Sequence, residues 1–465
     1  MTAQINSSKV NAFMNRFFIS DKRFYKKLLS IAVPIILQSS ITIGINLLDT
    51  LMLGNFGEGY LSATNMSNQF FNLYQIMCMG LGGGAAVMTA QAWGRQNQEG
   101  IHKALTIMLY LTVAIGSIFT VLTLIIPGPI MRIYTDDESV VRDCIVYYKY
   151  LSFCFLLHGV SLTLTQVLRT VGKTVIPLIS SIIGFVTNVF FNWVLIFGHL
   201  GFPRMELEGA ALGTLIARAA EFLFIGGYVF FFDKNMNYRI KNLFNTKFRD
   251  YLAPYFRYAI PVLISDTLLG LGNNMVAIVM GHISKEFVAA FSITSVTQQM
   301  VNVFTSGVMF ASSSMIGFTL GRGEKERAYE EGKTFLSLSV VIGIISGFVI
   351  YAIKVPVISS FNIGETTKQI ADSLMNSISF MIIFRMICSV LTKGVLRGGG
   401  DTKFLMVGDV AFLWAASVPL GAIAGLVLHM SAFWTYFFLN IDNILKAIWC
   451  MGRFKSKKWI HVLKR

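Results

Sequence analysis

Long apolar runs recur along the whole chain and restrict its fold more than any other feature. An α-helix needs about 20 mostly apolar residues to cross a bilayer, and only 14% of the residues are charged, against about 25% in soluble domains. The sequence therefore predicts an all-α membrane protein with twelve transmembrane helices. We expect these helices at about 28–53, 61–92, 103–127, 141–168, 174–198, 209–232, 255–280, 287–320, 332–355, 370–394, 403–428 and 431–452.

The placement of basic residues predicts the orientation in the membrane. The formal net charge of +15 would fit a nucleic-acid partner, but the basic residues lie mostly in the gaps between apolar runs. The termini and the loops on their side hold 29 of the 39 Lys and Arg residues, and the opposite loops hold 7. Cytosolic loops carry this excess. We expect a multi-pass protein of the cytoplasmic membrane with both termini in the cytosol, the lipid bilayer as partner and no nucleic acid.

The second half of the chain repeats the first. An offset of 227 carries Pro34 to Pro261 and Asn46 to Asn273, and an offset of 228 carries Leu168-Arg169 to Leu396-Arg397. Each half holds six predicted helices and enters the membrane from the same side, which predicts two six-helix lobes related by a parallel pseudo-two-fold repeat. We expect a cytosolic segment (1–27), lobes at 28–232 and 255–452, a linker (233–254) and a basic tail (453–465).

Motifs for bound groups and for catalysis are missing from the sequence. The five cysteines and six histidines are scattered, which gives neither a disulfide framework nor a metal-ligand cluster. The glycine run GLGGGAA at 80–86 lacks the Lys-Ser/Thr of a P-loop. We expect no cofactor, no enzymatic activity and an ion gradient, of Na⁺ or H⁺, as the energy source.

Several motifs stand out along the chain. They are LLDTLMLGNFG at the end of the first predicted helix, GRQNQE in the loop after the second, the pair LRTVGKTVIP and LRGGGDTKF, and NVFFNWVLIFG followed by EGAALGTLIAR. Together these motifs resemble the MATE family, the multidrug and toxic compound extrusion transporters. The resemblance covers about residues 25–455. It implies two lobes in a V with a central cavity, and export of amphipathic, often cationic compounds against inward flow of Na⁺ or H⁺. Within the family, the chain is more similar to the DinF-type branch, whose cation site uses an acid in the first helix. The other large branch uses acids in the seventh and tenth helices, and the positions that align with them here are Leu269 and Met386, neither of which is acidic.

Asp49 is the strongest candidate for coupling ion flow to export. It is the one carboxylate in the run 34–57, and its repeat partner is Val276. An acid inside a bilayer is rarely present without a use, although one near the interface also reaches water by snorkelling. At 1.5 Å rise per residue, Asn192 and Thr214 lie at the same depth, with Asn188 one turn deeper. One carboxylate among amide and hydroxyl oxygens suits a proton or Na⁺.

Other polar residues in the runs are candidates for cavity lining or for packing. Arg218 with Glu221 and Asp442 with Lys446 have the spacing of intrahelical ion pairs, which favours a structural role. Asp266, Arg385 and Asp409 either line the cavity or pair together. Cavity lining is also expected for Gln69, Asn72, Gln298 and Gln299.

The leading hypothesis is a monomeric, secondary active multidrug efflux antiporter for small amphipathic molecules. The alternative is a flippase of related fold for lipid-linked or large polar precursors, for which extra helices and a basic central cavity are expected. A membrane enzyme is the third class, and the sequence offers no Ser/His/Asp set or paired acids for it.

Overall fold

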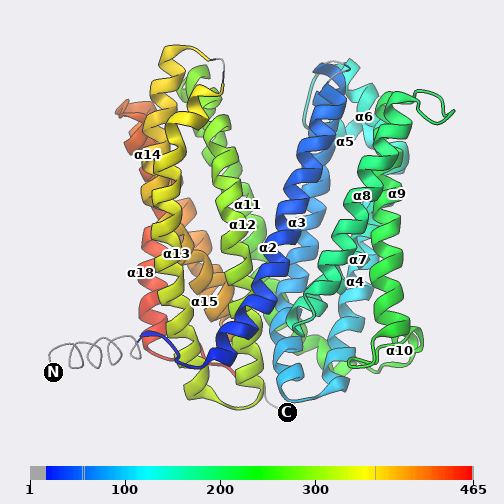
Figure 1. Cartoon of the computed structure of the whole chain (residues 1–465), viewed down its shortest axis with the longest axis vertical. Coiled ribbons are helices and arrows are strands. Elements are labelled where there is room, and N and C mark those ends of the chain that lie inside the picture. The colour runs from blue at the N-terminus through cyan, green and yellow to red at the C-terminus, as the bar shows by residue number, and fades with distance from the viewer. Residues whose placement is uncertain (1–16, 55, 57, 362, 463–465) are drawn as a thin grey trace. The chain divides into compact units, whose positions relative to one another are not determined.

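The structure is a computed structural model that describes residues 17–54, 56, 58–361 and 363–462. Every regular element among these residues is a helix (Figure 1), which confirms the predicted all-α fold. Ten of the described helices are long and apolar enough to cross a membrane, and the bent pair α6–α7 makes an eleventh.

The helices follow the predicted runs closely. The helices of the first half are α2 (Lys22–Gly54), α3 (Glu58–Gly94), α4 (Gln98–Ile125), α5 (Pro127–Met131), α6 (Glu138–Leu151), α7 (Cys154–Thr170), α8 (Val175–Phe197), α9 (Glu206–Gly227) and the π-helix η1 (Tyr228–Phe232). After α10 (Ile240–Asn245) come α11 (Arg249–Ile283), α12 (Lys285–Gly321), α13 (Lys325–Ser359), α14 (Glu365–Ser389), η2 (Val390–Leu396), α15 (Thr402–Phe412), η3 (Leu413–Ser417), α16 (Val418–Ala422), η4 (Ile423–Val427), α17 (Ala432–Leu439) and α18 (Asp442–Lys455).

The described residues form two compact units. Unit 2 holds Pro34–Thr89 and Gln96–Leu263, and unit 1 holds the residues up to Val33, Ala90–Arg95 and Ile264 onward. The chain passes between units inside α2 and inside α11, next to Pro34 and Pro261, the first pair of the repeat. The lobe boundaries expected at 28–232 and 255–452 stay a prediction.

A bend of 56° separates α6 from α7, so the predicted span 141–168 is a broken helix. Thr120 of α4 donates a hydrogen bond from Oγ1 to the backbone oxygen of Ser152 over 2.9 Å. The Ser152 hydroxyl donates back to the backbone oxygen of Tyr148 over 2.6 Å. Side chains that satisfy backbone groups in this way allow a helix to bend within a bilayer.

The predicted twelfth span, 431–452, differs most from its expectation. It consists of α17 and α18, each too short to cross a bilayer alone, and the helix breaks at Asn440 and Ile441. The hydroxyl of Ser417, in η3, accepts a hydrogen bond from the backbone N–H of Asp442 over 2.8 Å. This contact caps the first turn of α18 from another element, and a cap of that kind has no local sequence signature.

The two ends of the described chain lie at the same end of unit 1. Asp21, just before α2, pairs with Arg327 in the first turns of α13 over 3.2 Å. Near the other end, the ring of Phe454 stacks on Tyr329 of α13 with centroids 5.0 Å apart. Two ends that meet the same helix terminus fit an even number of membrane crossings.

The core of unit 2 is built from aromatic side chains. Tyr74, Phe119 and Phe155 are buried and lie ring to ring, with centroids 5.1–5.5 Å apart. The Tyr74 hydroxyl donates to the backbone oxygen of Phe155 over 2.6 Å. This cluster fixes α3, α4 and α7 against one another and supports the helices that carry the polar site.

Candidate functional site

Asp49 lies in a polar cluster near the end of α2 in unit 2. The side-chain amide of Asn192, in α8, donates from Nδ2 to Asp49 Oδ1 over 2.7 Å, and lies 3.3 Å from Asn188 Oδ1. Both asparagines are almost fully buried, whereas Asp49 is half-buried. The structure thus brings Asp49 and Asn192 together, as their equal depth predicts, with Asn188 one turn away on α8.

Tyr147, from α6, connects Thr214 of α9 to this cluster. Its buried side chain interacts with the Thr214 side chain and lies close enough to Asp49 for an electrostatic interaction. Four helices therefore supply polar groups here: α2, α6, α8 and α9.

A basic side chain lies beside this cluster. Arg218, one turn beyond Thr214 on α9, donates from Nη1 to Glu221 Oε2 over 2.8 Å. Its guanidinium also interacts electrostatically with Asp49. The pair that sequence spacing marked as structural is therefore part of the surroundings of Asp49.

Glycines let α8 and α9 approach closely enough to place Asn192. A Cβ atom at Gly213 would lie 2.2 Å from Asn192 Oδ1, and one at Gly209 would lie 2.7 Å from the backbone of Leu195. Gly209 and Gly213 form the small-xxx-small pattern of tightly packed membrane helices. The backbone of α9 thus sets the position of the amide that binds Asp49.

The side-chain oxygen of Asn192, Oδ1, is buried and has no hydrogen-bond partner among the described residues. A buried acceptor without a donor costs about 1–3 kcal/mol. A protonated Asp49 would supply a donor to that oxygen if the amide turned over. The arrangement can therefore accommodate both charge states of the carboxyl group.

The predicted cavity residues are dispersed. Gln69, Asn72 and Gln299 are exposed on their helices. Gln298 donates from Nε2 to the hydroxyl of Tyr436 over 2.8 Å. The structure does not bring these four residues into the Asp49 cluster.

The charged candidates of unit 1 lie in three separate places. Asp266 pairs with Arg397 and Lys393, each over 3.2 Å. Asp409 accepts a hydrogen bond from Ser265 over 2.6 Å and lies 3.5 Å from Lys446. Arg385 lies near Tyr436 instead, so these three candidates do not pair with one another.

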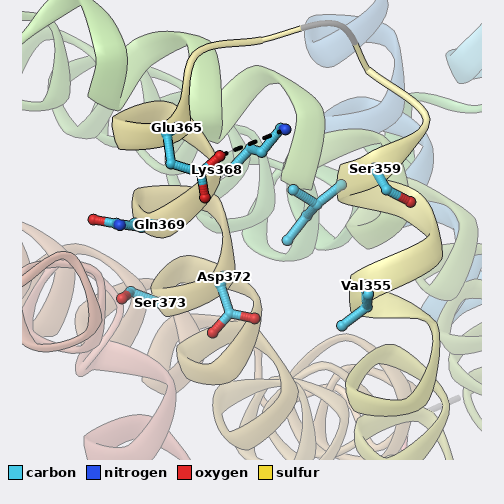
Figure 2. A pocket seen from close by; sticks show the side chains of 8 residues that line it. Val355, Ser359, Glu365, Lys368, Gln369, Asp372 and Ser373 are labelled. Atoms are coloured by element: carbon cyan, nitrogen blue, oxygen red, sulfur yellow. Dashed lines mark ion pairs between the residues drawn. The ribbon is translucent and has the colours of Figure 1, made fainter.

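A separate pocket of about 490 Å³ opens between the end of α13 and the start of α14 in unit 1 (Figure 2). Its charged residues pair among themselves and with a neighbour: Lys368 lies 3.6 Å from Glu365, and Asp372 lies 2.8 Å from Lys354. These mutual pairs leave the pocket less suited to an ion-coupling role than the cluster of unit 2.

Sequence reasoning missed Tyr147 and the closeness of Arg218 to Asp49. The signal for Arg218 was present, because it lies four residues after Thr214 on one helix face. No comparable signal marked Tyr147, which reaches the site only because α6 packs on α9.

A family model described as MatE matches the chain twice, at residues 34–194 and 261–423. The matches begin at Pro34 and Pro261, so they confirm the predicted duplication and the family resemblance. Among curated relatives, the "Probable multidrug resistance protein NorM" of Thermotoga maritima is 24% identical over 439 residues, covering 93% of each chain. The "Multidrug resistance protein PmpM" of Pseudomonas aeruginosa is 22% identical, covering 86% of this chain and 84% of its own.

Solved structures show the same fold. One described as the outward-facing conformation of a multidrug resistance MATE family transporter of the MOP superfamily superimposes with a TM-score of 0.84. It is 18% identical and covers 93% of this chain and 96% of its own. The predicted all-α, two-lobe fold is thereby confirmed.

Proposed function

This chain belongs to the MatE family of membrane transporters, and on that premise we propose that it is a proton-coupled multidrug exporter. Its cargo is small, amphipathic and often cationic, in line with the multidrug resistance proteins to which it is similar over most of its length. The exporter works as a monomer in the cytoplasmic membrane with both termini in the cytosol. It is a transporter and not an enzyme.

The observation that carries the proposal is the contact between Asp49 and Asn192. A carboxylate within an apolar helix is held by one amide at 2.7 Å, in a site that four helices build. Charging or neutralising Asp49 therefore changes a bond between α2 and α8. That change gives an ion a means to alter how the helices of unit 2 pack.

Arg218 favours a proton over Na⁺ as the coupling ion. The guanidinium of Arg218 interacts electrostatically with Asp49, so a positive group already stands beside that carboxylate. The second acid, Glu221, pairs with Arg218 at 2.8 Å and is engaged there. A proton neutralises Asp49 in place and needs no further oxygen ligands.

Asn192 gives each charge state of Asp49 a hydrogen-bond partner. Its Nδ2 donates to the ionised carboxylate, and its unpartnered Oδ1 would accept from the protonated carboxyl group. Turning the amide also breaks its contact with Asn188 on α8. Proton binding at Asp49 therefore rearranges the polar contacts along α8 and α9.

The test is export of a fluorescent organic cation by everted vesicles under separately imposed H⁺ and Na⁺ gradients. The proposal predicts accumulation under an H⁺ gradient alone. Accumulation that requires Na⁺ would contradict the proposal that the coupling ion is a proton. It would leave the proposal that the protein is an exporter intact.

A scrambling assay with fluorescent lipid in the same vesicles tests the flippase alternative. Movement of lipid without movement of drug would contradict the exporter hypothesis and support the flippase hypothesis.

A further inference from the structure

The chain between the two halves, residues 233–250, is a folded part of unit 2 (Figure 1). We term it the linker segment, and it contains the short helix α10. Its exposed surface carries apolar and basic side chains together. We propose that the linker segment is an interfacial anchor that binds anionic phospholipid in the leaflet on its side of the membrane.

Side chains of α4 hold the linker segment in place. His102 donates a hydrogen bond from Nε2 to the backbone oxygen of Met236 over 2.7 Å. The hydroxyl groups of Thr106 and Tyr238 lie 2.8 Å apart. Met236 and Tyr238 are both buried, with at most 1% of their surface exposed. The linker segment is therefore a fixed surface of unit 2 and not a free tether.

A contact between α4 and α10 gives the depth of α10 in the membrane. The Tyr110 hydroxyl donates to the backbone oxygen of Leu243 over 3.0 Å. Tyr110 lies about 10 Å inside the apolar run that is predicted to begin near residue 103. A helical side chain leans toward the N-terminus of its own helix by about one turn, which places Leu243 about 5 Å inside that run. Amphipathic helices that lie on a bilayer occupy this depth.

The outward face of α10 is apolar. Ile240 and Phe244 are spaced i, i+4, so they share one face of the helix. They are 48% and 74% exposed. A helix of six residues is not stable alone in water. Its contacts with α4 therefore present these two side chains to the surroundings of unit 2.

The start of α10 is tied to the end of η1. Arg239 donates from Nη1 to the backbone oxygen of Phe230 over 3.0 Å. The next two residues, Phe231 and Phe232, are 65% and 73% exposed, and they end the membrane span that begins at Glu206. The apolar face of α10 thus lies next to the point at which this span leaves the bilayer.

Lysine side chains accompany the apolar face. Lys234, Lys241 and Lys247 are exposed, and none of them forms an ion pair with a described residue. Lys241 follows Ile240 and borders the apolar face of α10. Long lysine stems can lie along apolar surface while the ammonium group reaches the lipid phosphates. Clusters of this kind next to a membrane are attracted to anionic lipid.

The acids of this surface do not cancel its positive charge. Asp233 is buried and pairs with Lys173 over 2.6 Å. Glu99 and Asp250 both pair with Lys103, over 2.9 and 2.7 Å. Bases outnumber these three acids in the linker segment and its paired neighbours: Lys103, Lys173, Lys234, Arg239, Lys241, Lys247 and Arg249. The excess positive charge favours an anionic partner.

Basic residues alone would only set the orientation of the chain, as in other cytosolic loops. The linker segment differs because its lysines lie beside exposed apolar side chains, on a fixed helix at interfacial depth. This combination is typical of helices that bind the membrane surface. The side of the membrane rests on the orientation in the proposed function, whereas the binding of lipid does not.

An anchored linker segment would position the start of α11. The linker segment leads directly into α11, along which the chain passes from unit 2 into unit 1. Asp250, in the first turn of α11, is already held to α4 by Lys103. Lipid bound at α10 would thus hold the first turn of α11 at the membrane surface.

A fluorescent label at position 244 tests the insertion of α10. The five native cysteines are buried, so a thiol-reactive label attaches to an added cysteine. In nanodiscs, a label on Phe244→Cys should lose fluorescence when the lipid carries a nitroxide near the start of its acyl chain. Asn245→Cys is the matched control, because the adjacent side chain is exposed but lies off the apolar face. Its label should lose less fluorescence.

Native mass spectrometry of protein purified with phosphatidylglycerol and phosphatidylcholine tests the preference for anionic lipid. The wild type should retain phosphatidylglycerol preferentially. Lys234→Gln/Lys241→Gln/Lys247→Gln should lose this preference by about fivefold per lysine, the effect of one basic residue near an anionic surface. The three lysines are exposed, so the variant should fold normally.

Lys325→Gln/Lys455→Gln/Lys458→Gln is the matched control. It removes three exposed lysines of unit 1, and the aromatic neighbours Phe454 and Trp459 are buried. It should retain phosphatidylglycerol like the wild type.

Two results would overturn the proposal. One is equal quenching of the labels at positions 244 and 245, which would leave the apolar face to a protein partner or a second copy of the chain. The other is an unchanged preference for phosphatidylglycerol in Lys234→Gln/Lys241→Gln/Lys247→Gln. Neither readout measures transport, so either result would leave the proposed exporter standing.

Discussion

The side-chain amide of Asn192 donates a hydrogen bond to the carboxylate of Asp49 over 2.7 Å and has a buried oxygen with no partner among the described residues. A single amide thus offers a donor to one charge state of the acid and an acceptor to the other. This relationship joins α2 to α8 and depends on the close approach of α9.

Gly213→Ala should impair coupling without touching a charged group. The added methyl group would lie 2.2 Å from Asn192 Oδ1, so the amide must move away from Asp49. We expect normal amounts of protein in the membrane and a loss of proton-driven export of about 5-fold or more, the lower range of coupling between linked sites. Vesicle efflux measures this loss.

Gly227→Ala, in the last turn of the same helix, is the control because its added methyl group meets nothing within 4 Å. It should export like the wild type. Equal efflux by both variants would show that the placement of Asn192 does not matter.

Asn192→Asp should introduce Na⁺ dependence. Two carboxylates in contact repel each other, and a monovalent cation between them relieves that repulsion. We expect efflux that Na⁺ stimulates in Asn192→Asp but not in Asn192→Ala, which removes the amide without adding charge. Na⁺ titration of vesicle efflux provides the measurement, and an Asn192→Asp protein indifferent to Na⁺ would argue against a cation site here.

Val276→Asp should fail to rescue a transporter that lacks Asp49. Val276 is buried in an apolar cluster with Val279, Met280 and Ile378, so an acid there would be placed among apolar side chains. Burial of an unpaired charge costs several kcal/mol, and less protein should reach the membrane. Val276→Ile is the apolar control. Restored export in Asp49→Asn/Val276→Asp would show that the two halves are interchangeable at this position.

Reporter fusions test the orientation that the basic loops predict. Fusions after residues 100, 245 and 460 should read as cytosolic, and those near 57 and 201 as external. One external result in the first group would contradict the parallel repeat of two six-helix halves.

The sequence predicted the runs of helix and the Asp49 cluster from local properties. Hydropathy located α2 and α8, and depth from the helix ends matched Asp49 with Asn192. Tyr147 could not be found in this way, because it depends on the packing of α6. The break before α18 was equally hidden, because its cap comes from Ser417 in a different element.

The ion pairs also show that local sequence does not reveal contacts between helices. Spacing along one helix predicted Arg218 with Glu221 and Asp442 with Lys446, and both pairs are present. Spacing could not reveal that each base also faces an acid from another helix, Asp49 in unit 2 and Asp409 in unit 1. In unit 2 the third member is Asp49, the candidate coupling carboxylate.

The most direct test of the account is proton-driven accumulation of a fluorescent cation by Asp49→Asn in proteoliposomes, with binding of the same cation measured in parallel. The account predicts that the variant still binds the cation but no longer accumulates it when an H⁺ gradient is imposed. Accumulation by Asp49→Asn at the wild-type rate would contradict the central claim that this carboxylate couples proton entry to export.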